Sequence, residues 1–292
     1  MPYNARAGVT AIVVTYESAD VLPACLAALN AEGIDVIVVD NASRDTTQQI
    51  AAGLGARVIA NRSNQGYGRA NNAGVRAAEG AAFCLIVNPD VVIAPGLVDA
   101  FLAAARTYPH AAAFGPRLVE PDGRIFFRAT SILAGRNAGA RAAPPSSDCE
   151  MVNVSGACLF VRRDMFLKLG GFDENIFLFY EDDDLCYRVI ESGSALMHIN
   201  GAAAQHLRGG SSGKGAELAF KIRYHQAWSR AYVCRKHNKP TDMTAMLLRN
   251  AVKYAGAVLA GNADRRARYG GSVAGTLDAM RRRSALKHEG LS

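Results

Sequence analysis

The chain has 292 residues, half of them hydrophobic, which permits a large core and excludes an intrinsically disordered protein. Its six cysteines are widely spaced and form no Cys-x-x-Cys pair, so neither a zinc ribbon nor a disulfide framework is expected, and a reducing cytoplasm is favoured. No signal peptide and no apolar run of transmembrane length is recognisable, so a membrane-spanning protein is not expected either.

The net charge of +7 is unevenly distributed. Residues 1–220 carry 18 basic and 22 acidic side chains, whereas residues 221–292 carry 15 basic and 4 acidic ones. The basic character therefore belongs to the C-terminal part. A surface of this kind suits an anionic lipid, a nucleic acid or an acidic partner.

The first part of the chain alternates apolar, β-branched runs with helical stretches. Continuous apolar runs are typical of strands that are buried on both faces, and hence of a mainly parallel sheet. The alternation predicts a doubly wound α/β fold with flanking helices. The predicted strands are residues 10–15, 36–40, 57–60 and 83–87, and the predicted helices are residues 19–30, 45–54, 69–78 and 96–108.

The rest of the chain is less regular until its end. Residues 136–150 are predicted to form a surface loop, 152–161 one or two strands, 163–169 a short helix, 170–173 a turn, and 195–200 and 203–206 a further strand or two. Helices are predicted at 216–237, 241–260 and from 264 onward. We therefore expect a catalytic domain at 1–215, divided near residue 116, and a basic helical region at 216–292.

Polar residues follow three of the predicted strands. The strand ends read Thr15-Tyr16-Glu17, Asp40-Asn41 and Asn88-Pro89-Asp90. Ligands of open α/β sheets bind beyond the carboxyl ends of the strands, so these residues predict a polar ligand site. A carboxylate at the position of Asp90 can hold Mg²⁺ or Mn²⁺, although helix capping is the alternative for any single aspartate.

A glycine-containing stretch opens the third predicted helix. Residues 64–72 read NQGYGRANN, which superficially suggests a phosphate loop. The stretch lacks both Gly-x-Gly-x-x-Gly and the Gly-Lys-Ser/Thr of a P-loop, so neither a dinucleotide fold nor a P-loop enzyme follows. Arg69 could instead approach a diphosphate or ribose, or it could be a solvated side chain beside a capped helix.

Four consecutive acids, Glu181 to Asp184, follow an aromatic run at residues 177–180. A solvated helix cap explains one or two of them, but not four after a hydrophobic approach. One of these carboxylates is a candidate general base. His206 ends an apolar stretch and enters a glycine-rich segment, where a ligand role and a structural role are both open.

The order and spacing of these pieces over residues 9–235 resemble the inverting family-2 glycosyltransferases with the GT-A fold, and within them the bacterial rhamnosyltransferase-type enzymes that build cell-surface polysaccharides. The matching pieces are residues 13–18 (VVTYES), 38–45 (VVDNASRD), 64–72 (NQGYGRANN), 88–90 (NPD), 155–157 (SGA) with 162–163 (RR), 170–174 (GGFDE), 180–188 (YEDDDLCYR), and His206 with 210–212 (GSS).

The resemblance implies a role for each matching position. Asp182 corresponds to the catalytic base. Asp90 corresponds to the metal-binding aspartate of the Asp-x-Asp motif, and His206 to a histidine that completes that site. The acceptor is expected near Gly156, Ala157, Glu181 and Asp183. The nucleotide sugar is expected at Thr15, Tyr16, Glu17, Asp40, Asn41, Asn64, Gly66, Arg69, Asn71, Asn88 and Asp90.

The chain departs from the family pattern at two positions. Asn88 stands where the first carboxylate of the Asp-x-Asp motif is usual, which implies a weaker metal site. Asp183 stands where a neutral residue is usual in the acidic motif, so the assignment of the base between Asp182 and Asp183 stays open.

The reaction implied is an inverting transfer, with Mg²⁺ or Mn²⁺, of a sugar from a nucleotide-diphosphate donor to a saccharide acceptor. The expected donor is dTDP-L-rhamnose and the expected acceptor is carried on a lipid diphosphate. The basic C-terminal helices, with Arg265, Arg266, Arg268 and residues 281–283, could hold the enzyme at the inner face of the cytoplasmic membrane, or form a solvated face or a homodimer surface. No nucleic-acid partner is expected. The alternatives are a nucleotidyltransferase and a non-catalytic nucleotide-sugar-binding assembly subunit.

Overall fold

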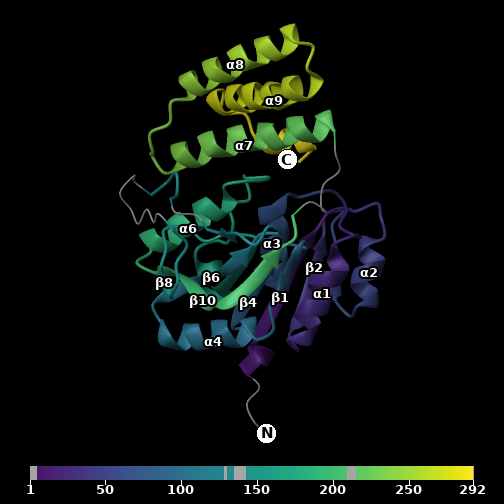
Figure 1. Ribbon diagram of the computed structural model, residues 1–292, viewed down its shortest axis with the longest axis vertical. Helices are drawn as coiled ribbons and strands as arrows, with labels where there is room; N and C mark the ends of the chain where they lie inside the picture. The colour runs from purple at the N-terminus through teal and green to yellow at the C-terminus, as the bar shows by residue number, and fades with distance from the viewer. Residues whose placement is uncertain (1–4, 128–129, 135–142, 209–214, 292) are drawn as a thin grey trace.

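The computed structural model describes residues 5–127, 130–134, 143–208 and 215–291. A mixed α/β domain lies beneath a layer of three helices, α7 (Ala216–Lys236), α8 (Met243–Leu259) and α9 (Ala263–Met280) (Figure 1). The first described residues, 5–8, lie at the opposite end of the molecule from this layer (Figure 1).

The first part of the domain follows the predicted alternation of strand and helix. β1, β2 and β4 are almost wholly buried along their length, because their unbroken apolar runs have helices on both sides. The bounds are η1 (Ala5–Gly8), β1 (Val9–Thr15), α1 (Leu22–Ala31), β2 (Asp35–Asp40), α2 (Thr47–Gly53), β3 (Arg57–Ala60), α3 (Tyr67–Ala77) and β4 (Phe83–Val87).

The second part differs in several places from the prediction. β6 was not predicted, and the strand or two expected at 195–206 are one strand, β10, whose register with β6 shifts between Ile199 and Ala203. The bounds are β5 (Val91–Ile93), α4 (Leu97–Thr107), β6 (Ala111–Val119), β7 (Ile125–Phe126), β8 (Cys149–Glu150), β9 (Cys158–Arg162), α5 (Arg163–Lys168), α6 (Glu181–Glu191), β10 (Ala195–His206) and η2 (Ala285–Glu289). Of the predicted loop at 136–150, residues 136–142 lie outside the described residues, and β8 forms at its end.

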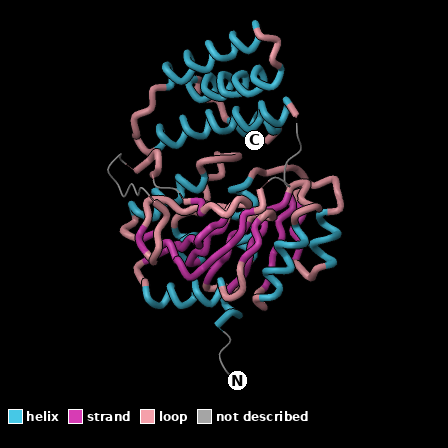
Figure 2. Tube along the Cα trace, in the orientation of Figure 1, coloured by secondary structure: helices cyan, strands magenta, loops and turns pink. Residues whose placement is uncertain are grey.

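One sheet runs through the domain in the order β3-β2-β1-β4-β9-β6-β10-β5, with β7 paired to β6 and β8 to β10 (Figure 2). Along this path, β3, β2, β1, β4, β6 and β10 run in one direction, and β9 and β5 in the other. The expectation of a mainly parallel sheet with flanking helices is confirmed. The carboxyl ends of the six parallel strands meet at one edge.

Two apolar clusters cover the two faces of the sheet. One includes Leu26 of α1 and Phe101 of α4, and the other includes Val75 of α3 and Leu185 of α6. Each face of the sheet is therefore covered by its own set of helices, as a doubly wound fold requires.

The helical layer is held together by close contact between α7 and α9. A Cβ atom added at Gly271 would lie 2.2 Å from the carbonyl oxygen of Phe220, and one at Gly275 equally close to that of Tyr224. Only glycine permits this approach of the two backbones. Within the described ranges, no helix combines the length and apolarity that crossing a bilayer requires.

The layer also docks on the α/β domain, through α7. Ser229 Oγ donates to the Leu178 carbonyl at 3.0 Å, and the rings of His225 and Phe177 stack at 4.7 Å. Val233 packs in a small buried cluster with Leu133 and Ile176 of the domain. The middle and the end of α7 and the segment before α6 are thus fixed against each other.

Candidate active site

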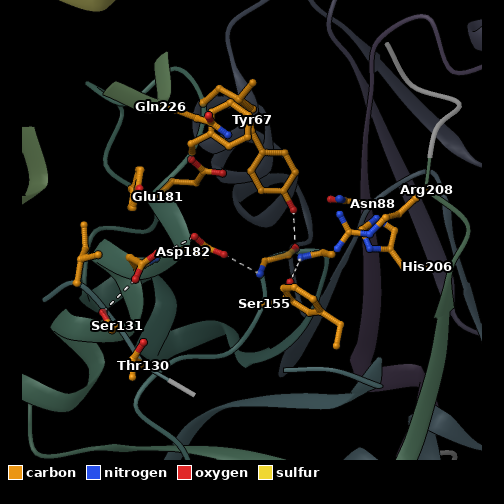
Figure 3. Close-up of a pocket in the computed structure, with 18 residues that line it drawn as sticks. Tyr67, Asn88, Thr130, Ser131, Ser155, Glu181, Asp182, His206, Arg208 and Gln226 are labelled. Carbon is orange, nitrogen blue, oxygen red and sulfur yellow. Dashed lines mark hydrogen bonds between the residues drawn. The ribbon is translucent and has the colours of Figure 1, made fainter. Parts of the chain in front are cut away.

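A cavity of about 610 Å³ opens where the carboxyl ends of the strands approach α6 and α7. His206, Arg208 and Asn88 lie on one side of it, and Glu181 and Asp182 on the other, with Tyr67 and Ser155 between them (Figure 3). Sequence positions more than a hundred residues apart therefore share one space.

The ends of β1 and β2 form a tightly bonded corner beside this space. Asp40 is fully buried and accepts hydrogen bonds from Thr15 Oγ1 at 2.9 Å, the Ser43 backbone N–H at 2.9 Å and Gln48 Nε2 at 2.7 Å. Thr15 and Asp40 are direct partners in the parallel register. The corner is therefore rigid around the Asp40 carboxylate.

Two neighbours of this corner point to solvent or to the next loop. Tyr16 is 45% exposed, which leaves its ring available to stack on a flat ligand. Glu17 has a left-handed backbone with φ 52°, and its carboxylate accepts a hydrogen bond from the Arg44 backbone N–H at 3.0 Å.

The loop before α3 is tied to the same corner through Asn41. Its Nδ2 donates to the Gly66 carbonyl at 3.1 Å, and the Gly66 N–H donates to Asn64 Oδ1 at 2.9 Å. Gly66 has φ 82°, and an added Cβ would lie 2.5 Å from the carbonyl oxygen of Phe177. A glycine is needed here for both reasons.

The structure does not bring Arg69 and Asn71 into the cavity. Arg69 Nε donates to the Glu174 carbonyl at 2.8 Å, on the outer side of α3. Asn71 is buried and its Nδ2 donates to the Tyr67 carbonyl at 3.0 Å, while its Oδ1 has no hydrogen-bond partner. Their assignment to the nucleotide stays a prediction.

Asp90 and His206 converge because β5 and β10 pair antiparallel, with His206 opposite Val91. His206 Nε2 lies 3.3 Å from Asp90 Oδ2, and the Leu207 N–H donates to the Asp90 carbonyl at 2.8 Å. The buried Asn88 Oδ1, two residues before Asp90, has no hydrogen-bond partner. Residues 210–212, which the sequence grouped with His206, lie outside the described residues.

The oxygen and nitrogen atoms of Asp90, His206 and Asn88 fit a metal site in which a bound substrate supplies the remaining ligands. Among the residues that the structure describes, no group of three or more His, Cys, Asp or Glu side chains is arranged around a common centre. Mg²⁺-type sites commonly use one or two carboxylates together with substrate phosphates and water. Asp90, His206 and the amide oxygen of Asn88 suit such a site better than a preformed cage.

An ion pair that the sequence did not reveal stands beside His206. Arg208 pairs with the buried Glu120, which directly follows β6, with 2.8 Å from Nη2 to Oε1. This hydrogen bond raises the pKa of the guanidinium. His206 Nδ1 lies 4.0 Å from the same carboxylate. Arg208 lines the cavity. The only sign in the sequence that Arg208 belongs to the site was its position two residues after His206.

α6 begins at Glu181, after Phe179 and Tyr180 in left-handed backbone conformations with φ 69° and 66°. This turn directs the helix N-terminus at the cavity. Asp182 Oδ2 accepts from the Gly156 N–H at 3.2 Å and its Oδ1 from the Asp183 N–H at 3.0 Å. These bonds orient the carboxylate along the cavity wall.

The four acids of the run have separate environments. Glu181, Asp182 and Asp183 line the cavity, and Asp183 accepts a hydrogen bond from Ser131 Oγ at 3.0 Å. Asp184 is fully buried away from it. Its partners are Arg188 Nε at 2.8 Å, Lys236 Nζ at 2.7 Å and His237 Nε2 at 2.7 Å. Asp184 therefore anchors α6 to the end of α7.

The segment at 155–157 connects the two sides of the cavity. Tyr67 Oη donates to the Gly156 carbonyl at 2.7 Å, and the Asn88 N–H donates to the Ala157 carbonyl at 2.9 Å. Burial raises the pKa of Tyr67 well above its usual value, so the phenol keeps its proton. A Cβ on Gly156 would lie 3.3 Å from that of Asp182.

Sequence reasoning also missed Gln226, which reaches the cavity from α7. α7 was assigned to a separate basic region, and the amphipathic pattern of a helix does not say which loop it will cover. Ser131 and Tyr67 were likewise without a predicted role.

Comparison with known proteins identifies the family of the chain. The chain matches the glycosyl transferase family 2 over residues 10–170. It is 30% identical to the N-acetylglucosaminyl-diphospho-decaprenol L-rhamnosyltransferase of Mycobacterium tuberculosis, over 78% of this chain and 84% of that protein.

Solved structures share the fold at low sequence identity. The mannosyltransferase PcManGT from Pyrobaculum calidifontis, in complex with GDP-Man and Mn²⁺, superposes with a TM-score of 0.58 at 16% identity, over 95% of this chain and 88% of that one. Residues 1–349 of S. aureus TarS, in complex with UDP-GlcNAc, give 0.56 at 15% identity, over 94% and 92%. The chain is a family 2 glycosyltransferase with the GT-A fold.

Proposed function

We propose that this enzyme transfers L-rhamnose from dTDP-rhamnose, with inversion, to a saccharide acceptor carried on a lipid diphosphate. The observation that supports this proposal best is that Asp182 lies across one cavity from His206 (Figure 3), whose Nε2 is 3.3 Å from Asp90 Oδ2. An in-line displacement needs the base beside the acceptor and the leaving group's counter-charge on the other side of the anomeric carbon.

In this proposal Asp182 removes the proton of the attacking acceptor hydroxyl. The N–H groups of Gly156 and Asp183 hold its carboxylate in position. The new bond forms at the anomeric carbon as the bond to the nucleoside diphosphate breaks. A positioned base contributes about 10²–10⁴-fold to such a step. Glu181 and Asp183 lie beside Asp182 and are proposed to contact the acceptor with Gly156 and Ala157.

The nucleotide is proposed to bind at the corner formed by Thr15, Asp40 and Asn41, with Tyr16 and Glu17 at its rim. Asn64, Gly66, Arg69, Asn71 and Asn88 remain proposed contacts. Mg²⁺ or Mn²⁺, when bound, would offset the charge developing on the leaving diphosphate, and Asp90 and His206 would hold it. Arg208 offers a fixed positive charge on the same side.

The names of one relative and of two similar structures support the choice of a nucleotide-sugar donor, a lipid-linked acceptor and a divalent ion. The relative from M. tuberculosis is named as a rhamnosyltransferase of a sugar linked to diphospho-decaprenol. PcManGT binds GDP-Man with Mn²⁺, and TarS binds UDP-GlcNAc. The lipid in the relative's name, six free thiols and the basic helices also support a cytoplasmic enzyme that meets an anionic surface at the inner face of the cytoplasmic membrane.

Family membership leaves the nucleotidyltransferase alternative without support. A non-catalytic assembly subunit is also disfavoured, because the cavity keeps three carboxylates beside the bonded corner of Asp40.

The test is a transfer assay with purified protein, MnCl₂ or MgCl₂, and a synthetic N-acetylglucosaminyl diphospholipid. dTDP-rhamnose, UDP-GlcNAc and GDP-mannose are compared as donors, and the anomeric configuration of the product is read by NMR. We expect product from dTDP-rhamnose, inverted at the anomeric carbon and lost on addition of EDTA. Transfer from another donor, a retained configuration or activity resistant to EDTA would each overturn the corresponding part.

A further inference from the structure

Helix α8 presents an apolar face that no other described residue covers. The α8 stripe consists of Ala245, Leu248, Val252, Ala255 and Leu259, at spacings of three and four residues that place them on one face. Leu248 is 61% exposed, Val252 73% and Leu259 90%. α8 is the outermost helix of the helical layer, on the side away from the α/β domain (Figure 1).

A cationic groove runs beside the α8 stripe. It has a volume of about 540 Å³, and its charged lining residues are Arg223, Arg249, Lys253, Arg265 and Arg268. Within the part of the chain that the structure describes, no acidic side chain lines it. The groove joins the stripe because Arg249 and Lys253 directly follow Leu248 and Val252 on α8.

We propose that the α8 stripe and the cationic groove together dock on an anionic lipid bilayer. An interfacial helix buries its apolar face at the boundary of headgroups and acyl chains while basic side chains at its polar edge meet lipid phosphates. α8 has this arrangement and carries no acidic residue. Leu248, Val252 and Leu259 enter the interface, and the groove holds the phosphate of an anionic headgroup.

The charges on α8 favour a lipid bilayer over a second copy of the chain as the partner of this surface. Two α8 stripes packed face to face would bring Arg249 and Lys253 of one copy near those of the other, and α8 offers no acid to pair with them. A nucleic acid would use the cationic groove but would leave Leu248, Val252 and Leu259 in water. A bilayer satisfies both features.

This docking rests on the proposed function, which brings the enzyme to an anionic membrane surface, and it names the residues that meet that surface; docking itself needs neither donor nor acceptor. The test is flotation of the full-length protein with vesicles of phosphatidylcholine alone and of phosphatidylcholine with phosphatidylglycerol, without substrates. We expect binding to the anionic vesicles only, weakened by salt. Val252→Asp should abolish it, and R249Q and K253Q should each weaken it about five-fold.

Matched controls come from α4, at the opposite end of the molecule from α8 (Figure 1). Ala103 and Arg106 are exposed on that helix. A103D and R106Q change charge as V252D and R249Q do, and should leave vesicle binding unchanged. Circular dichroism melts show whether each variant is folded, and R249Q and K253Q carry the test if V252D is not.

Three results would overturn the docking proposal. They are no binding to anionic vesicles, equal binding to neutral ones, and a dimer in light scattering that Val252→Asp dissociates. None of them bears on transfer to a water-soluble acceptor, so a failure of docking is distinguishable from a failure of the proposed glycosyl transfer.

Discussion

Asp90 is the carboxylate that faces His206 at 3.3 Å, and the position two residues before it is an asparagine. An amide oxygen is a weaker ligand than a carboxylate, because it carries no net charge. The proposed metal site therefore depends strongly on Asp90. His206 and the diphosphate of the donor would supply the other contacts.

Replacing Asp90 by Asn should raise the Mn²⁺ concentration needed for half-maximal transfer by about 10–100-fold, the range seen when a supporting group of a metal site is lost. The measurement is a Mn²⁺ titration of the transfer rate at saturating donor. Asp164→Asn, on the exposed start of α5, is the control. An unchanged Mn²⁺ dependence in Asp90→Asn would place the ion elsewhere.

Site residues could be predicted from the sequence where they stand at the end of a predicted strand. Asp40 and Asp90 follow buried strands, so their common edge could be inferred from the fold. Glu120 and Gln226 could not, because β6 and α7 reach the site only through tertiary packing. For Arg69 the local sequence pattern was misleading. It suggested a contact with the ligand, whereas the side chain donates a hydrogen bond to the Glu174 carbonyl.

At the scale of elements, the strands most easily predicted were those with unbroken β-branched runs. β6 was missed because it reads AAAFGPRLV, in which alanines suggest a helix and Gly115 and Pro116 suggest a turn. Packing favours a glycine at position 115, since an added Cβ would lie 3.0 Å from Val154 Cγ1 and would force that side chain to shift. Local propensity is overridden here by the pairing of β6 with β9 and β10.

The end of α7 is clamped to the domain by two buried carboxylates, Asp173 and Asp184. Lys236 Nζ lies 2.7 Å from both, and Tyr232 Oη donates to Asp173 at 2.9 Å. Burial alone would raise the pKa of Asp173, but the hydrogen bonds from Lys236 and from the backbone and side chain of Asn175 outweigh it and lower the pKa to about 2.

This lowered pKa predicts a pH dependence of stability. A carboxyl whose pKa is lower in the folded state stabilises the fold above its unfolded pKa of about 3.9, and loses that contribution as pH falls towards 2. Asp173→Asn should cost roughly 2 kcal/mol of unfolding free energy at pH 7 and progressively less below pH 4. Urea unfolding of both proteins between pH 7 and pH 2 measures this. A difference that stays constant with pH would show that Lys236 does not act through the charge of Asp173.

At the scale of the whole molecule, the helical layer and the α/β domain share a wall of the site. The division at residue 215 was expected from charge and composition, and it remains a prediction. α7 nevertheless contributes Gln226 to the cavity, Val233 to a buried cluster and two partners to Asp184. α7 therefore forms part of the wall of the candidate site as well as part of the basic region.

A shortened chain ending at residue 215 should lose both transfer and stability. Without α7, the carboxylate of Asp184 would keep Arg188 but lose Lys236 and His237, and Leu133 and Ile176 would be uncovered. Removing one partner of a buried ion pair typically costs about 3–5 kcal/mol. Gel filtration with light scattering and the transfer assay measure the outcome. A monomeric shortened chain with the full transfer rate would show that the site is complete without α7.

The proposed role of Asp182 as the base of the glycosyl transfer can be tested directly. Its most direct measurement compares the turnover and donor affinity of Asp182→Asn and Asp183→Asn with those of the natural chain, using the transfer assay and calorimetric titration of the donor with Mn²⁺. We expect Asp182→Asn to lower turnover about 10²–10⁴-fold with donor affinity retained, and Asp183→Asn to lower it far less. Full turnover by Asp182→Asn, or a loss confined to Asp183→Asn, would contradict the assignment.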